Sequence, residues 1–188
     1  LGRISFTDEN LFTVKKYPDI LSDIFGSFLL KDDIVAGFPW FSAWGRDTMI
    51  SMKALLYTGK LPLYLKILDK YGKKLQKGIL PNVFGEGGEG TNYNSIDAAL
   101  WFAVRIGDVY PLIEDEKIKS RLFGYLSEII GNYAFNKILP FFTDEDGLLE
   151  IKTGDDALTW MDAKVYNRPV TPRWGKPVEI NALWYNAL

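Results

Sequence analysis

Apolar residues recur at three- and four-residue spacing along several segments of this chain, a pattern typical of helices that pack on a core. The clearest segment covers residues 61–75, where the apolar positions share one face and lysines occupy the opposite one. The same spacing predicts helices at about 47–57, 61–75, 95–108 and 116–137, and a last helix that runs from Glu179 to Leu188. Helices that follow one another in pairs predict an all-α fold.

The connections between these helices are long and rich in polar and aromatic residues. Residues 78–92 are glycine-rich and cannot form regular structure for long, and residues 152–177 show no regular pattern. Short strands fit residues 11–14 and 147–151, while residues 20–30 suit either a helix or a strand. Because binding residues concentrate on loops held by a rigid scaffold, we expect the functional site on these connections.

Composition narrows the range of partners. Of the 188 residues 47% are apolar, enough for a substantial core, and no stretch approaches the roughly 18 apolar residues of a membrane span. The net charge is −2 without a basic stripe, so neither nucleic acid nor a membrane is an expected partner. The first residues show no signal peptide, and we expect a cytoplasmic protein. Leu1 stands where a methionine would begin a complete chain, which suggests that residues precede it.

The chain contains neither cysteine nor histidine. This excludes thiolate nucleophiles and histidine-based triads, and it removes most transition-metal ligands, so we expect no metal and no cofactor. Carboxylates remain for any proton transfer. Aromatic residues make up 15% of the chain, and several lie beside polar residues in segments bounded by glycine or proline. Aromatic rings pack on the C–H faces of sugars, so the composition points first to carbohydrate.

Asp97 lies where the polar run Asn92–Ser95 enters an apolar helix. A carboxylic acid beside aromatic rings is a candidate general acid for sugar chemistry. The alternative is a structural role: if Asn94 caps the helix, Asp97 occupies the third helical position, where a carboxylate is favoured. That position also favours the charged form, so an acid would need a carboxylate neighbour or a dry aromatic wall. Candidate neighbours are Asp47, Glu86 and Glu89.

A second cluster covers residues 37–48 and contains Trp40, Trp44, Arg46 and Asp47. Asp47 is suited to accept hydrogen bonds from sugar hydroxyls, Arg46 to orient a carboxylate, and either tryptophan to form the floor of a subsite. The alternative is a local ion pair between Arg46 and Asp47 at the start of a helix.

Two further clusters lie in the irregular region before the last helix. Residues 158–164 contain Trp160 and Asp162, and residues 169–181 contain Trp174 and Glu179. In the structural alternative the tryptophans only anchor loops, and Glu179 is a first-turn residue after Pro177. Together the four clusters place a carboxylate in each of four segments rich in Trp, Asn, Gly and Arg.

These segments carry a family resemblance. The runs GFPWFSAWGRDT, NYNSIDAALWF and PVTPRWGKPVEINALWYNAL resemble the C-terminal glucosidase domain of glycogen debranching enzymes, the amylo-α-1,6-glucosidase region. The resemblance implies part of an (α/α)6 toroid of helical hairpins, truncated at its C-terminus. It implies that residues 1–30 form a lead-in segment or the end of a preceding domain, and that residues 31–188 form the N-terminal portion of the glucosidase domain.

The resemblance also implies an activity, the removal of α-1,6-linked glucose from glycogen or a branched α-glucan with inversion, a reaction that needs an acid and a base. It assigns Asp97 as the catalytic acid. It assigns substrate binding to Asp47, Asp162, Arg46, Trp40, Trp44, Asn94 and Trp160. The family's base is a glutamate in a later segment, beyond Leu188, so we expect this chain to be inactive alone.

Two alternatives remain open. The first is another toroidal glycosidase of trehalase-like or glucoamylase-like specificity, because the motifs define the scaffold better than the linkage. The second is a carbohydrate-binding protein that keeps the aromatic platform without catalysis.

Overall fold

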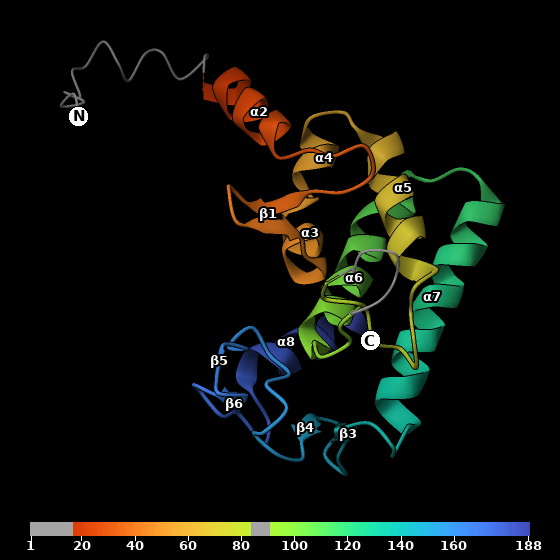
Figure 1. The fold of residues 1–188 in the computed structure, drawn as a ribbon. Helices are drawn as coiled ribbons and strands as arrows, with labels where there is room; N and C mark the ends of the chain where they lie inside the picture. Colours follow the sequence, from red (N-terminus) through yellow and green to blue (C-terminus); the bar gives the residue numbers. More distant parts are fainter. Residues whose placement is uncertain (1–16, 84–90) are drawn as a thin grey trace, which may run out of the picture.

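The computed structural model describes residues 17–83 and 91–188, in which helices dominate (Figure 1). The helices are α2 (Tyr17–Ser27), α3 (Gly45–Ser51), α4 (Ala54–Tyr57), α5 (Leu61–Gly72), α6 (Ile96–Val109), the short 3-10 helix η3 (Tyr110–Leu112), α7 (Glu116–Phe135) and α8 (Val178–Ala187). Antiparallel two-stranded sheets join β1 (Val35–Gly37) to β2 (Phe41–Ala43), β3 (Phe141–Thr143) to β4 (Leu149–Ile151), and β5 (Lys164–Val165) to β6 (Arg168–Pro169). The fold is helix-rich, as predicted, but these small sheets make it less than purely all-α.

Helix α6 lies at the centre of the described structure (Figure 1). Ten of its 14 residues are buried, and it packs against α3, α7 and α8. Two fully buried tyrosines donate hydrogen bonds to its carbonyl groups, Tyr64 to Arg105 at 2.7 Å and Tyr133 to Ile96 at 2.9 Å. Buried phenols need such partners, so both ends of α6 are fixed by packing and by hydrogen bonds.

Four predicted helices are confirmed with small shifts at their ends, as α5, α6, α7 and α8. The single helix predicted at 47–57 is wrong, because α3 begins at Gly45, ends at Ser51 and is followed by a turn before α4. The Ser51 hydroxyl donates to the Asp47 carbonyl at 2.6 Å, a side-chain bond that competes with the helical ladder. Most of residues 20–30 belong to α2, whereas the strand predicted at 11–14 lies outside the described residues.

The irregular region before α8 contains the hairpin of β5 and β6, which periodicity did not reveal. Its turn consists of Tyr166 and Asn167, both at positive φ, 48° and 61°. Two such residues give a turn whose twist matches that of the strands, but glycine is the usual signal for it. Because tyrosine occupies the first turn position, the sequence does not indicate this turn.

Helix α8 is anchored to the sheet of β3 and β4. The Asn181 amide accepts from the Leu149 N–H at 2.7 Å and donates to the Leu149 carbonyl at 3.0 Å. One turn further on, the Trp184 indole N–H donates to the Gly147 carbonyl at 3.0 Å. These bonds set the orientation of the first turn of α8, which carries Glu179.

Candidate functional site

Arg46, in the first turn of α3, connects three segments that are distant in sequence. Its Nε donates to Asp97 at 2.8 Å, its Nη1 to Asp162 at 2.9 Å, and its Nη2 to the Thr159 carbonyl at 3.1 Å. The Arg46 side chain is only 11% exposed, so these are largely desolvated charge-assisted bonds. Burial opposes the charge of Arg46, but the two carboxylates outweigh it, and the pKa of the guanidinium is raised above its ordinary value.

The backbone around Arg46 is held by a second segment. The Gly45 N–H donates to the Asn82 carbonyl at 2.7 Å, and the Arg46 N–H donates to the Asn82 side chain at 3.3 Å. A Cβ at Gly45 would lie 2.2 Å from the Pro81 carbonyl oxygen, so only glycine allows this approach. The tight packing at Gly45 thus places the first turn of α3 against residues 81–83.

Asp97 lies in the first turn of α6 and is 3% exposed. The helix cap is Ser95 rather than Asn94: the Ala98 N–H donates to Ser95 Oγ at 3.2 Å, so Asp97 is the second helical residue and not the third. The Ser95 hydroxyl also donates to Asp97 Oδ1 at 2.5 Å, while Oδ2 accepts from Arg46. Both carboxylate oxygens of Asp97 therefore have partners.

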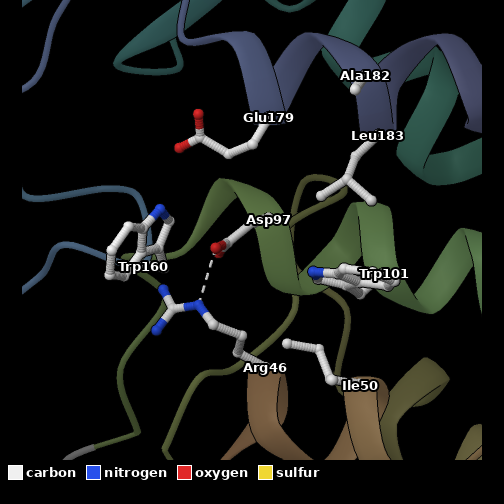
Figure 2. Close-up of a pocket in the computed structure, with 8 residues that line it drawn as sticks. All are labelled: Arg46, Ile50, Asp97, Trp101, Trp160, Glu179, Ala182 and Leu183. Carbon is white, nitrogen blue, oxygen red and sulfur yellow. Dashed lines mark hydrogen bonds and ion pairs between the residues drawn. The ribbon is translucent and has the colours of Figure 1, made fainter.

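A pocket of about 440 Å³ opens beside this ion pair (Figure 2). Its walls are Arg46, Ile50, Asp97, Trp101, Trp160, Glu179, Ala182 and Leu183. Three helices each contribute two residues to it, a polar residue in the first turn and an apolar residue four positions later. Residues four positions apart share a helix face, so both members of each pair reach the pocket. One end of the pocket is therefore charged and the other apolar.

A second pocket of about 230 Å³ shares the Arg46 side chain with the first. Its walls are Ala36, Phe41, Trp44, Arg46, Asp47 and Asp162. Burial raises the pKa of Asp47 above its ordinary value, and the neighbouring positive charge of Arg46 only partly opposes this. Arg46 and its two carboxylate partners thus lie between two concave surfaces, each with at least one tryptophan.

The structure brings together most of the predicted site residues. Arg46, Asp97 and Trp160 line the first pocket, and Trp44, Asp47 and Asp162 line the second together with Arg46. Trp40 lines neither: it lies next to β2 in the β1–β2 hairpin and is 85% exposed. Asn94 also lines neither, and its side-chain oxygen is buried without a hydrogen-bond partner in the structure. Glu86 and Glu89 lie outside the described residues.

Several residues of the first pocket were not among the predicted site residues. Trp101 and Ile50 lie four positions after Asp97 and Arg46, so helical spacing could have identified them. Glu179 is one of the four clustered carboxylates of the sequence, but the family resemblance does not assign it to the site. Ser95 and Thr159 lie outside the pocket lining but accept hydrogen bonds from Arg46, Ser95 through its hydroxyl at 3.3 Å and Thr159 through its carbonyl at 3.1 Å, and nothing in the sequence indicates these two contacts.

Chemically, the two pockets offer charged hydrogen-bond acceptors, donors and indole faces. This combination suits a ligand with both hydroxyl groups and apolar C–H surfaces, as in a carbohydrate. Residues 17–83 and 91–188 contain no group of three His, Cys, Asp or Glu side chains placed to hold a metal ion. Among the helices of the same ranges, none has the length and apolar character that crossing a membrane requires.

Comparison with known proteins gives the family. Residues 26–188 match the profile of the family described as Amylo-alpha-1,6-glucosidase. The chain is also 36% identical, over an alignment of 218 residues, to a protein of Saccharomyces cerevisiae named glycogen debranching enzyme. That alignment covers 82% of this chain and 14% of the yeast protein. The chain belongs to the amylo-α-1,6-glucosidase family of glycoside hydrolases, and it spans about a seventh of the length of this relative.

Proposed function

We propose that this chain is part of a glucosidase domain that hydrolyses the α-1,6-linked glucose at branch points of glycogen or a similar branched α-glucan. The observation that carries the proposal is the ion pair of Arg46 and Asp97, which lines a pocket together with Trp101 and Trp160. In a histidine-free chain, a buried carboxylate can supply the acid of sugar hydrolysis, and indole faces can pack on the sugar. The family match and the name of the yeast relative support the same activity.

In this proposal Asp97 is the general acid that protonates the glycosidic oxygen. Arg46 binds Asp97 at 2.8 Å and Asp162 at 2.9 Å, so the guanidinium keeps an ion pair with Asp162 when Asp97 takes part in the reaction. Asp47 adds a further negative charge nearby, and Glu179 lines the same pocket as Asp97. Carboxylates therefore outnumber the cations around the proposed acid.

In this proposal the activation of water requires a second carboxylate. Hydrolysis with inversion needs a carboxylate base roughly 6.5–9.5 Å from the acid, with a water molecule between base and sugar. We propose that this base follows Leu188 and that residues 31–188 form the N-terminal portion of an (α/α)6 toroid. Asp47, Asp162, Arg46, Trp44 and Trp160 would then bind the sugar, and Trp40 and Asn94 would act from outside the two pockets.

The test uses the full-length protein that contains this segment. We expect Asp97→Asn to lower glucose release from an α-1,6-branched limit dextrin by roughly two to four orders of magnitude, the usual contribution of a general acid. Affinity for the dextrin should remain within a few-fold. The matched control is Asp115→Asn at the cap of α7, where asparagine caps as well as aspartate and activity should not change.

Each alternative function predicts a different result. A trehalase-like or glucoamylase-like enzyme would hydrolyse trehalose or maltose faster than the branched dextrin. A carbohydrate-binding protein would bind the dextrin without releasing glucose from any of these substrates. Unchanged turnover in the Asp97→Asn variant would refute the acid assignment while leaving the family intact.

A further inference from the structure

Glu179 faces Asp97 across the first pocket (Figure 2). It lies in the first turn of α8, whose position is fixed by the bonds of Asn181 and Trp184 to the β3–β4 hairpin. The carboxylate is directed toward the side of the pocket where the Trp160 ring lies, while Leu183 forms the apolar wall one turn further along the helix (Figure 2). A rigid helix therefore holds a carboxylate opposite the proposed acid.

Arg173 binds both oxygens of Glu179, through Nη1 and through Nη2, the latter at 3.0 Å. The same Nη1 donates to Thr159 Oγ1 at 3.2 Å, and the Thr159 carbonyl accepts from Arg46. Thr159 is 1% exposed, so a buried residue connects the two arginines. Thr159 and Arg173, which do not line the pocket, thus connect Arg46 and Asp97 to Glu179, which do, through one continuous chain of polar contacts.

An ion pair with this exposure would stabilise the fold by little on its own. The side chains of Arg173 and Glu179 are 22% and 32% exposed. Its location gives the pair another use, because Glu179 lines a cavity and a carboxylate accepts hydrogen bonds from sugar hydroxyls. Bonds to a charged acceptor are about twice as strong as neutral ones. The Arg173 guanidinium also holds the pKa of Glu179 below its usual range, so the carboxylate is charged at neutral pH.

We propose that Glu179 is a substrate-binding residue that accepts hydroxyl hydrogen bonds from the sugar in this pocket, and that Arg173 is its positioning residue. This inference rests on the proposed glucosidase function. It also specifies the substrate class: Arg46 and Arg173 are already paired with carboxylates, so the pocket selects a neutral sugar and disfavours a uronic acid or a sugar phosphate.

The experiment compares Glu179→Gln with Glu116→Gln in the full-length protein. Glu116 is a matched control because it also lies in the first turn of a helix and pairs with a cation, Lys119, on an exposed surface. We expect Glu179→Gln to weaken glucose binding, measured by calorimetry, by roughly tenfold to a hundredfold. The KM for the branched dextrin should rise by a similar factor, and kcat should change less. The affinity for glucuronate should fall less than the affinity for glucose.

The role of Arg173 is tested by a double-mutant cycle. Arg173→Gln should weaken glucose binding less than Glu179→Gln, and it should make binding fall at mildly acidic pH because the carboxylate is no longer held charged. In the Glu179→Gln background the same substitution should add little. Additive effects of the two substitutions would overturn the positioning role.

Three outcomes would contradict the inference. If Glu179→Gln and Glu116→Gln bind glucose with equal affinity, Glu179 does not bind the substrate. The proposed function still stands in that case, provided that the wild type releases glucose. A collapse of kcat at unchanged KM, restored by azide with formation of a glucosyl azide, makes Glu179 the base instead. A wild-type protein that neither binds glucose nor releases it overturns the proposed function and this inference together.

Discussion

At the scale of single residues, the planar guanidinium of Arg46 organises the candidate site. From one side chain it binds Asp97, Asp162 and the Thr159 carbonyl through three different nitrogens. A lysine would carry the same charge, but its single nitrogen cannot reach three acceptors that lie around a plane. The geometry of this residue, and not only its charge, therefore holds the α3, α6 and 158–164 segments together.

We predict that Arg46→Lys lowers the free energy of unfolding by about 1–3 kcal/mol, because it leaves buried acceptors unsatisfied. Urea denaturation followed by circular dichroism measures this change. Arg121→Lys on α7 is the control: Arg121 pairs with Asp69 at 3.1 Å but is 47% exposed, so the substitution should cost less than about 0.5 kcal/mol. Equal stability of the two variants would show that the charge of Arg46 suffices.

Asp47 gives a prediction for pH dependence. Its pKa is raised by burial, so between its ordinary pKa and the raised one the folded state binds more protons than the unfolded state. In that window Asp47 makes stability fall as the pH rises. We predict that Asp47→Asn lacks this contribution. The stability of the variant minus that of the wild type should therefore be greater above the raised pKa than at acidic pH.

The measurement is the difference in Tm between wild type and Asp47→Asn at a series of pH values from about 3 to 7. This difference isolates the effect of Asp47 from that of other carboxylates. The pKa of Asp144, for example, is lowered by Lys176, so Asp144 stabilises the fold as the pH rises. A Tm difference that does not change with pH would contradict the assignment.

At the scale of secondary structure, the short helix α3 is positioned by contacts on two sides. Its first residue, Gly45, packs against the backbone of Pro81, and its fourth, Thr48, donates to the buried Asp33 at 2.8 Å. Asp33 also accepts from Lys70 at 2.6 Å and from Tyr71, both on α5. A helix of seven residues is not stable by itself, so these contacts decide where Arg46 and Asp47 lie.

We predict that Gly45→Ala lowers the free energy of unfolding by about 1–3 kcal/mol, because the added methyl group meets a carbonyl oxygen that cannot move without shifting residues 81–83. It should also reduce glucose affinity in the full-length protein, since Arg46 and Asp47 move with the helix. The control is Gly107→Ala in α6, where nothing lies within 4 Å of an added Cβ. That variant should gain about 0.5–1 kcal/mol. Loss of stability in both variants would point to a general cost and not to the contact with Pro81.

At the scale of the whole molecule, the sequence predicted what depends on local periodicity. Helices α5, α6 and α7 have long amphipathic patterns, and these fixed their type and approximate ends. The turn after Ser51 and the hairpin around Tyr166 were missed, because both depend on hydrogen bonds or backbone angles that a pattern of apolar residues does not contain. The predicted cap of α6, Asn94, lies one residue before the observed cap, Ser95, because asparagine and serine are equally good cap residues.

The candidate site was predictable as residue types but not as an arrangement. The four polar and aromatic clusters were visible because such residues are unusual beside glycine and proline. Their association was not, since Arg46 contacts a carboxylate 51 positions away and another 116 positions away. Only tertiary packing divides them between two pockets, leaves Trp40 exposed and sets Glu179 opposite Asp97.

This chain of 188 residues can be expressed and assayed alone. We expect it to release no glucose from the branched dextrin, because inversion needs a base as well as an acid. In our proposal Asp97 is the acid, Glu179, paired with Arg173, binds the substrate, and the base follows Leu188. A glucose-oxidase assay on the chain and on the full-length protein, at equal concentration, measures this. The Asp97→Asn variant of each controls for contaminating hydrolase. Glucose release by the short chain that its Asp97→Asn variant lacks would mean that a residue within these 188 serves as the base.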